Sequence, residues 1–301
     1  MKKKWYKGKT FVITGASGDI GSEVCRKFAP LGLRMYLLDL MNPKLNDLVS
    51  ELGNLGAEHV EAIEMDVTNQ EQIKSTFDYI GKTEGCIDIL HNNAGIGGMV
   101  SITNGGSFDD YRKIMSINVD GMWLVLQAAL PYIGRAAPTK KNPERKQGQL
   151  IFTSSSAGKT GIPNMAAYSM SKHAVVGLAD SIRREFEMLG HDIQVICVCP
   201  APARTKFWAS DPELEKWVEQ YQQKGLLYKF IEAEDVANRI LKASRKYKKE
   251  IYVPRYWWLI PFLQMFSHHT VGKLLIKIEE AKKDMPSVNS KNEKSQGKSE
   301  E

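Results

Sequence analysis

The amino-acid sequence predicts an α/β fold built on a doubly wound parallel sheet of about seven strands, and three observations point to it. Short apolar segments alternate with longer amphipathic ones along most of the chain, which is typical of strand–helix–strand units with right-handed crossovers. A glycine-rich turn at residues 14–21 separates the first of these strands from the first helix. Finally, Tyr168 and Lys172 are four residues apart in a segment with helical character, so both lie on one helix face.

Taken in order, each apolar run that ends at a polar or glycine-rich loop is a predicted strand: residues 10–13, 34–38, 59–65, 87–90, 149–153, 193–199 and 250–253. Helices are predicted where apolar residues recur at helical spacing. The first runs from the glycine-rich turn to about residue 29, and the others cover 46–55, 70–83, 108–133 and 165–189.

Length and composition favour one folded domain. The chain has 301 residues, of which 43% are hydrophobic, enough to bury a large core. We assign residues 1–254 to a single catalytic domain, 255–281 to an apolar and basic C-terminal helical extension, and 282–301 to a disordered polar tail.

Charge and cysteine usage narrow the class of protein further. The formal net charge is +6, and solvated lysines near the two ends explain it better than a nucleic-acid partner does. The first lysines lead directly into a short strand, which argues against a signal peptide and for a cytoplasmic location. The four cysteines lack the spacing of a metal or disulfide framework, so we expect no metal. Cys197 and Cys199 alternate within an apolar strand and are predicted to be core thiols on one face of it, in a reducing compartment.

The glycine-rich turn predicts a nucleotide ligand. A strand, a glycine-rich turn and a helix form the setting in which a dinucleotide pyrophosphate lies on a helix N-terminus. Gly15 allows the tight turn, and Gly21 lets the helix pack closely on the strand. Asp39, at the end of the second strand, can bind the hydroxyls of an adenosine ribose. Leu40 and Met41 follow it without an arginine or lysine to receive an extra phosphate, so NAD is expected and NADP is less favoured.

Tyr168 and Lys172 predict proton transfer. A tyrosine hydroxyl titrates near 10, and a nearby ammonium should lower that pKa so that the hydroxyl can exchange a proton at neutral pH. Ser155 lies thirteen residues before Tyr168, just after the strand at 149–153. A hydroxyl at that strand end can hold a carbonyl or alcohol oxygen beside the tyrosine.

In combination these features resemble the short-chain dehydrogenase/reductase family of Rossmann-fold enzymes, from about residue 9 to residue 254. The match rests on the turn 14–21, Asp66-Val67, Asn92-Asn93-Ala94-Gly95, Asn118, Ser155, Tyr168, Lys172 and the segment 200–205. The resemblance implies a catalytic set of Asn118, Ser155, Tyr168 and Lys172. It implies a cofactor-binding set of Gly15, Ser17, Gly18, Asp19, Ile20, Gly21, Asp39, Asp66, Val67, Asn93, Ala94, Gly95, Tyr168, Lys172, Pro200 and Thr205.

The resemblance also implies individual roles. Asp66 and Val67 would lie near the adenine, and Asn118 would interrupt a long helix and help to hold a proton-relay water. Lys172 would bind the nicotinamide ribose as well as tune the tyrosine. We further expect a homodimer or homotetramer.

Two positions depart from the family pattern. Asp19 stands where the family usually has glycine, and Gly18 where it has another residue; Asp19 could cap the helix, although its carboxylate would repel a pyrophosphate. Ala201 stands in place of the glycine that follows Pro200. It would be strained if that position required a positive φ.

Substrate choice is expected to reside outside these motifs. The segment at about 203–231 matches the family's substrate lid, and its aromatic residues suit either substrate contact or packing of the lid: Phe207, Trp208, Trp217 and Tyr221. The polar insert 138–147 is expected to be a solvated loop away from the site. In the extension, Trp257, Trp258 and flanking lysines suit an interfacial helix that contacts a membrane peripherally, and equally a capping helix or subunit contact. Pro261 and the short apolar run argue against a spanning helix.

We therefore expect an NAD-dependent oxidoreductase that moves hydride between a nicotinamide and a small apolar alcohol or carbonyl substrate, such as a steroid, retinoid or fatty chain. A 3-oxoacyl-thioester reductase is the alternative enzyme, for which basic residues around the substrate mouth are expected. A non-catalytic nucleotide-sensing protein with this fold is the alternative outside enzymes, and it would need no tyrosine–lysine pair.

Overall fold

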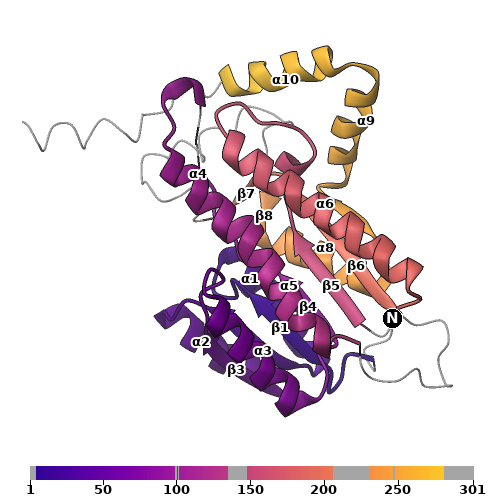
Figure 1. Ribbon diagram of the computed structural model, residues 1–301. Coiled ribbons are helices and arrows are strands. Elements are labelled where there is room, and N and C mark those ends of the chain that lie inside the picture. The colour runs from indigo at the N-terminus through magenta and orange to yellow at the C-terminus, as the bar shows by residue number, and fades with distance from the viewer. Residues whose placement is uncertain are drawn as a thin grey trace, which may run out of the picture.

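A computed structural model describes residues 5–98, 100, 102–134, 148–205, 231–246 and 248–280. Within them a seven-stranded, fully parallel sheet has the order β3-β2-β1-β4-β5-β6-β9 (Figure 1). Its strands are β1 (Thr10–Thr14), β2 (Arg34–Asp39), β3 (His59–Glu64), β4 (Ile89–Asn92), β5 (Gly148–Thr153), β6 (Ile193–Pro200) and β9 (Glu250–Val253). The short strands β7 (Ala203–Arg204) and β8 (Ile231–Glu232) pair separately. The predicted doubly wound α/β fold is confirmed.

Helices cover both faces of the sheet. The α-helices are α1 (Asp19–Phe28), α2 (Pro43–Asn54), α3 (Gln70–Glu84), α4 (Phe108–Met115), α5 (Gly121–Ala129), α6 (Ala166–Met188), α8 (Ala233–Lys246), α9 (Leu259–Phe266) and α10 (His268–Glu280). Shorter helical turns are η2 (Ala29–Leu31), η3 (Ile102–Asn104), η4 (Ser116–Asp120), η5 (Leu130–Tyr132), η6 (Ser156–Gly158) and η9 (Arg255–Trp258).

The alternation of side chains along β1 explains the two layers. Phe11 and Ile13 belong to a core formed with α1, α2 and α8, whereas Val12 belongs to a second core with α3, α5 and α6. Successive strand residues point to opposite faces, so a strand buried on both sides reads as a continuous apolar run. This is why the predicted strands were recognisable as short apolar blocks.

The structure differs from the sequence prediction at several elements, among them α2, β4 and α8. Helix α2 begins at Pro43 instead of residue 46 because the Asn42 side chain caps it, accepting a hydrogen bond from Leu45 N at 3.1 Å. Strand β4 begins two residues later than predicted, and the side chain of Asp88 just before it accepts a hydrogen bond from Thr10 N at 2.9 Å. Helix α8 was not predicted, although it buries an apolar face against α1 and β9.

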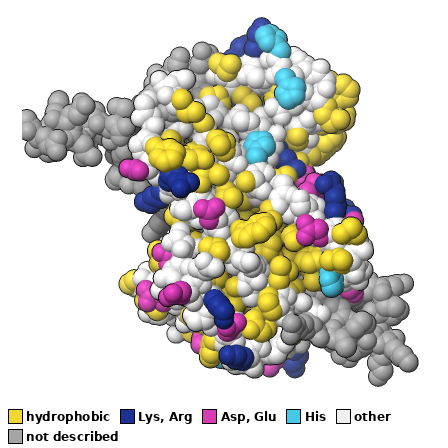
Figure 2. Space-filling model, viewed as in Figure 1, with side chains coloured by type: hydrophobic (Ala, Val, Ile, Leu, Met, Phe, Trp, Pro, Cys, Tyr) yellow, Lys and Arg dark blue, Asp and Glu magenta, His cyan; other side chains and the backbone are white. Residues whose placement is uncertain are grey.

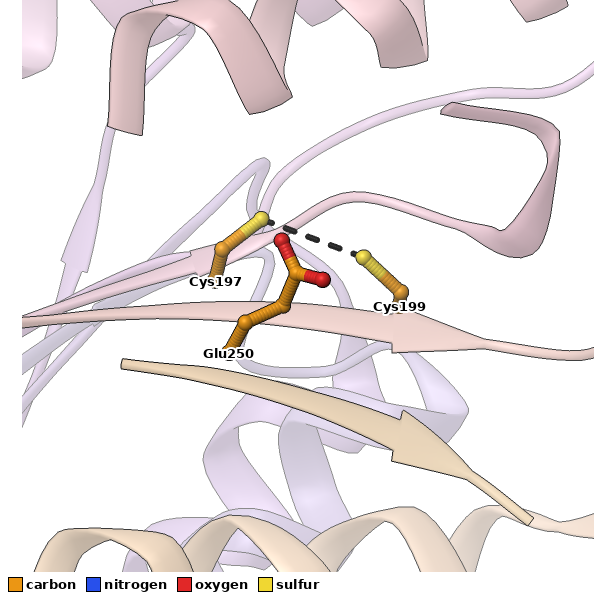
Figure 3. Close-up of side chains that lie close together, drawn as sticks. All are labelled: Cys197, Cys199 and Glu250. Carbon is orange, nitrogen blue, oxygen red and sulfur yellow. Dashed lines mark hydrogen bonds between the residues drawn. The ribbon is translucent and has the colours of Figure 1, made fainter. Parts of the chain in front are cut away.

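The prediction that Cys197 and Cys199 are core thiols on one face of their strand is confirmed. Cys197 and Cys199 are almost completely buried, on the same face of the strand, with their sulfur atoms 3.9 Å apart (Figure 3). Glu250 of β9 lies beside them, because β6 and β9 pair with Cys197 opposite Glu250.

The C-terminal extension consists of η9, α9 and α10, which project from the end of β9 (Figure 1). Figure 2 shows hydrophobic side chains on the surface of this part of the molecule. The exposed apolar residues of η9 and α9 are Tyr256, Trp258, Leu259, Phe262, Leu263, Met265 and Phe266. A hydrogen bond of 2.6 Å from Gln264 Nε2 to Thr160 Oγ1 links α9 to the main body. Thr160 lies just beyond η6, so α9 lies close to the loop that carries Ser155.

Among the described residues, one continuous helical run, Phe108–Tyr132, is long and apolar enough to cross a membrane by length and composition alone. Its α5 portion buries Met122, Val125 and Leu126 in the core it shares with α3 and α6. A core helix of this kind satisfies the same criteria as a membrane span.

Candidate active site

The candidate site lies at the carboxyl edge of the sheet, where the parallel strands end together. Asp39 ends β2, Asn93 follows β4, Ser155 follows β5 and Pro200 ends β6. Ligands of open α/β sheets bind in the crevice outside these strand ends. The topology therefore gathers residues that are far apart in the sequence.

Two positions of the glycine-rich turn have a backbone conformation or a close contact that only glycine allows. Gly15 has φ +66°, and a Cβ there would lie 2.9 Å from the Cα of Ala94. A Cβ on Gly21 would lie 2.1 Å from the carbonyl oxygen of Gly15, so only glycine permits this packing of α1 against the turn. The turn therefore leads the first-turn N–H groups of α1 toward the strand ends.

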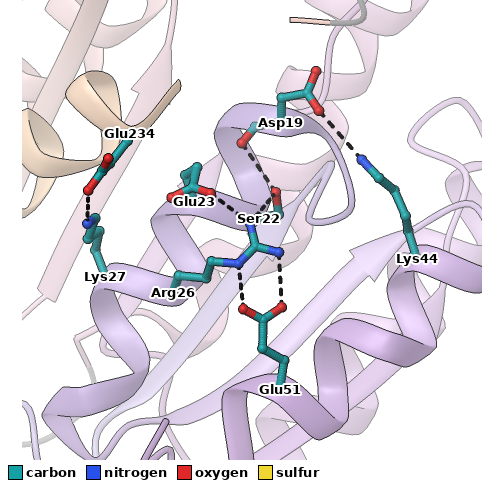
Figure 4. Close-up of polar contacts among 8 residues, drawn as sticks. All are labelled: Asp19, Ser22, Glu23, Arg26, Lys27, Lys44, Glu51 and Glu234. Carbon is teal, nitrogen blue, oxygen red and sulfur yellow. Dashed lines mark hydrogen bonds and ion pairs between the residues drawn. The ribbon is translucent and has the colours of Figure 1, made fainter. Parts of the chain in front are cut away.

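The prediction that Asp19 caps α1 is wrong. Gly18 occupies the N-cap position, with φ −64° and ψ 160°, and Asp19 is the first helical residue. Its carboxylate lies 3.5 Å from the ammonium of Lys44 on α2 (Figure 4). That ion pair offsets part of the repulsion between Asp19 and a bound pyrophosphate.

The carboxylate of Asp39 is oriented by the turn. Its Oδ2 accepts hydrogen bonds from the backbone N and the hydroxyl of Ser17, at 2.8 and 2.7 Å, and its Oδ1 accepts one from Leu40 N at 2.8 Å. Asn42 adds a hydrogen bond of 3.0 Å to the Ser17 hydroxyl. Asp39 is thus a fixed negative charge with further acceptor capacity, suited to ribose hydroxyls.

The segment after β4 is fastened to the glycine-rich turn. The Thr14 hydroxyl accepts hydrogen bonds from Asn93 N and Ala94 N, each at 3.0 Å, and Asn93 Nδ2 donates to the carbonyl oxygens of Thr14 and Gly15 at 3.1 and 3.2 Å. A Cβ on Gly95 would lie 3.2 Å from Lys172 Nζ. Glycine at that position keeps space open in front of the lysine.

Asn118 lies in the π-helical turn η4, which separates α4 from α5 within one long helical run. Its fully buried side chain accepts a hydrogen bond from Ile96 N and donates to Ile96 O, both at 2.8 Å. It also donates to the hydroxyl of Ser171 on α6 at 3.0 Å. A π-turn re-aims a side chain within a helix, and here it connects the segment after β4 to α6.

Ser155, Tyr168 and Lys172 meet at the junction of β5, η6 and α6. The Ser155 hydroxyl caps η6 by accepting a hydrogen bond from Ala157 N at 3.1 Å, and it also hydrogen-bonds with Tyr168. The Lys172 ammonium lies 5.7 Å from the centre of the Tyr168 ring and donates to the carbonyl oxygen of Thr153 at 3.1 Å.

The expected effect of Lys172 on the tyrosine is not what the structure shows. Desolvation raises the pKa of Tyr168 to about 12, and the hydrogen bond with Ser155 counteracts only part of this rise. Desolvation also lowers the pKa of Lys172 to about 8. Burial is the largest cause of both pKa shifts, and the Lys172 ammonium donates to a backbone carbonyl.

The remaining predicted residues follow two strands, β3 of the seven-stranded sheet and β7 of the separate two-stranded sheet. Asp66 and Val67 lie in the loop after β3, where Asp66 Oδ1 accepts hydrogen bonds from the backbone N and the hydroxyl of Thr68, both at 2.8 Å. Thr205 lies just beyond β7. The predicted strain at Ala201 is wrong: Asn164 is the non-glycine residue with positive φ in the described part of the chain. Ala201 extends the β6–β9 ladder by donating to Val253 O at 2.7 Å.

Several residues that support the site were not identified from the sequence. Thr153 holds Lys172 through its carbonyl, and its hydroxyl donates to Asn93 Oδ1 at 3.0 Å. His91 lies 2.8 Å from that hydroxyl, and burial lowers its pKa to about 3, so it is neutral. Ser154 donates to Lys172 O at 2.8 Å. A cluster of hydroxyl residues ending a buried strand was the available signal, but it does not reveal the partners.

Three segments for which the sequence made predictions fall outside the described residues. This applies to 206–230, which includes the aromatic residues of the predicted lid, to the insert at 138–147 and to the tail at 282–301.

Comparisons with known proteins agree with this geometry. A family profile described as short chain dehydrogenase matches residues 9–216. The chain is 35% identical over 199 residues to the oxidoreductase UcpA of Salmonella typhimurium, covering 66% of this chain and 70% of that protein. It is 26% identical over 280 residues to rat 17-beta-hydroxysteroid dehydrogenase 13, covering 93% and 86% of the two chains.

A crystal structure of a short chain dehydrogenase/reductase from Burkholderia phymatum, in complex with NAD, superposes with a TM-score of 0.70. It is 25% identical in sequence, and the match covers 84% of this chain and 90% of that one. The profile spans more than half of the sequence and includes the glycine-rich turn, Asn118 and the Tyr168–Lys172 pair. The chain therefore belongs to the short chain dehydrogenase family of oxidoreductases.

Proposed function

We propose that this protein is an NAD-dependent oxidoreductase that interconverts an alcohol and a carbonyl group. The observation that carries the proposal is the convergence of Ser155, Tyr168, Lys172 and Asn118 beside a glycine-rich helix N-terminus. A nucleotide-sensing protein would need the helix N-terminus and Asp39 but not a hydroxyl pair backed by a buried lysine.

The described residues fit a dinucleotide. The turn presents the N-terminus of α1 to the pyrophosphate, Asp39 would accept hydrogen bonds from the adenosine ribose, and Gly95 leaves the space in front of Lys172 open. When bound, the nicotinamide supplies the hydride-transfer chemistry. The NAD complex of the Burkholderia phymatum relative supports the same choice of cofactor.

The chain's own residues would handle the substrate oxygen and its proton. Ser155 holds that oxygen beside the Tyr168 hydroxyl, which gives a proton to a developing alkoxide or takes one from an alcohol. Lys172 provides a positive charge and a ribose donor, while Thr153 fixes its orientation. Asn118 positions α6 through Ser171, whose hydroxyl in turn donates to Tyr168 O at 2.8 Å.

The substrate class that fits best is apolar: a steroid, a retinoid or a fatty chain. The exposed apolar side chains of α9 lie near the loop that carries Ser155, because Gln264 is bonded to Thr160 beyond η6. The similarity to a 17-beta-hydroxysteroid dehydrogenase supports the same class.

The test is NAD- and NADP-linked turnover over a panel of steroid, retinoid, long-chain and short-chain alcohols and ketones, with 3-oxoacyl thioesters as one arm. Turnover of apolar alcohols or ketones with NAD is expected. Preference for the thioester would overturn the substrate assignment, and cofactor binding without turnover of any panel member would favour the sensing role. Tyr168→Phe serves as the matched inactive control, since it keeps the ring but removes the transferable proton.

We also propose that the extension contacts a membrane surface from one side. Trp258, Phe262 and Phe266 are 48%, 42% and 75% exposed, and basic residues in α10 accompany them. Flotation with anionic liposomes tests this, comparing the wild type with the triple variant Phe262→Ser, Met265→Ser, Phe266→Ser. The control is Met188→Ser, an exposed apolar residue at the end of α6. Equal flotation of wild type and triple variant would favour packing against a second subunit.

A further inference from the structure

Strands β6 and β9 place two cysteines, a glutamate and a tyrosine together on one face of the sheet. The register pairs Cys197 with Glu250 and Cys199 with Tyr252, and residues two apart in a strand share a face. In Figure 3 the Glu250 carboxylate points toward the space between the two sulfur atoms. One ligand atom from each cysteine and from Glu250 lies within 4.8 Å of the other two.

We propose that Cys197, Cys199 and Glu250 form a binding site for a thiophilic divalent cation such as Zn²⁺. The sulfur atoms are 3.9 Å apart. With metal–sulfur bonds of about 2.3 Å, that separation subtends roughly 115° at the metal, within the range of tetrahedral and trigonal sites. The spacing of the two cysteines along β6 already places their sulfur atoms at the separation that a shared metal ion requires. Metal binding would therefore need little rearrangement of the two thiols.

A disulfide is a poorer interpretation of the same pair. Cα atoms two residues apart in an extended strand are about 6.6 Å from each other, close to the upper limit for a disulfide. Forming that bond would require the strand to buckle within the β6–β9 ladder and would also need an oxidant. Metal binding needs neither, and the third ligand comes from the neighbouring strand.

The surroundings balance the charge of a loaded site. Two thiolates, one carboxylate and a divalent cation carry a net charge of −1, and the Lys159 ammonium is 2.6 Å from Glu250 Oε2. Binding is therefore a balanced exchange, in which the cation enters, two thiol protons leave, and the Lys159 charge neutralises the product. A buried charge is tolerated when it is paired in this way.

The site also has a route to solvent. The thiols themselves are almost fully buried, but the side chains of Lys159 and Glu250 are 19% and 27% exposed. A cation can arrive along the Glu250 side, where a water molecule would complete four-fold coordination. None of its three ligands belongs to the proposed catalytic or cofactor-binding set, but Cys197 and Cys199 lie close enough to Lys172 to interact with it electrostatically.

The experiment titrates the full-length, reduced and metal-stripped protein with Cd²⁺, whose bonds to thiolate give an ultraviolet charge-transfer absorption. One Cd²⁺ per chain is expected, with Zn²⁺ displacing it and two protons released per ion. Cys199→Ala should abolish the absorption, and Glu250→Gln should weaken binding at least tenfold. Cys86→Ser removes a partly exposed thiol outside the site and should leave the titration unchanged.

Circular dichroism and thermal unfolding confirm that each variant is folded. The proposal is overturned if the folded wild type gives no charge-transfer absorption. It is equally overturned if Cys199→Ala and the wild type titrate alike, or if Cys86→Ser abolishes the signal. Replacement of Cys197 by alanine provides a second variant at the site should Cys199→Ala not fold, and it should likewise remove the absorption.

Discussion

Replacing Lys172 with methionine should stabilise the protein relative to wild type at neutral pH, and this gain should shrink as the pH rises. Lys172 is 4% exposed, and burial lowers its pKa from 10.5 to about 8. Each pKa unit corresponds to about 1.4 kcal/mol, so keeping the ammonium in the fold costs about 3 kcal/mol. Methionine has a similar length and no charge to desolvate.

The pH window follows from the two pKa values. Below about pH 8 the lysine is protonated in both the folded and the unfolded state, and the full cost is present. Between about 8 and 10.5 the unfolded chain binds the proton that the folded chain has released, so wild-type stability rises with pH. The advantage of the variant should therefore fall by about 2–3 kcal/mol between pH 7 and pH 10.

Interactions that do not depend on pH do not alter this change in the stability difference between variant and wild type. Lys172→Met also removes the hydrogen bond to Thr153 O, which costs about 1 kcal/mol and offsets the variant by a constant amount. At about 2 °C per kcal/mol for a chain of this size, the gap in Tm between variant and wild type should narrow by about 5 °C.

Calorimetry of the ligand-free proteins at pH 7, 8, 9 and 10 measures the effect. Lys242→Met, on the exposed face of α8, is the matched control and should follow the wild type at every pH. Parallel curves for Lys172→Met and wild type, or a gap that widens with pH, would refute the claim that this ammonium is held in the fold against its desolvation cost.

Three further predictions concern the site. Tyr168→Phe should lower kcat by about two orders of magnitude or more while cofactor affinity, measured by fluorescence titration, stays unchanged; near-normal turnover would remove the tyrosine from its role. Ser155→Ala should move the rising limb of the pH–rate profile to higher pH, because the pKa of Tyr168 loses the hydrogen bond that lowers it; an unmoved limb would contradict this. Asp39→Asn should reduce a preference for NAD over NADP that we expect to be about a hundredfold or more in kcat/KM, or roughly 3 kcal/mol; parity in the wild type would sink the assignment.

Much of the fold was determined by local patterns in the sequence. Strands buried on both faces read as apolar runs, and helices that cover them have apolar residues at helical spacing, so the alternating order could be predicted. The glycines of the turn were recognisable because each serves a backbone need within a few residues. The Tyr168–Lys172 pair was recognisable because one helical turn fixes both positions on one face.

Tertiary structure determined the hydrogen-bond partners, the pKa values and the neighbours of the site residues. Asn118 meets Ile96 and Ser171 only because a π-turn faces the end of β4 and the side of α6. The pKa of Tyr168 is set by how deeply α6 buries it, which the spacing of two residues cannot specify. Likewise, Glu250 joins Cys197 through the register of β6 and β9, although the two residues are far apart in the sequence. Periodicity is a property of neighbours along the chain, whereas desolvation and strand register depend on packing between distant segments.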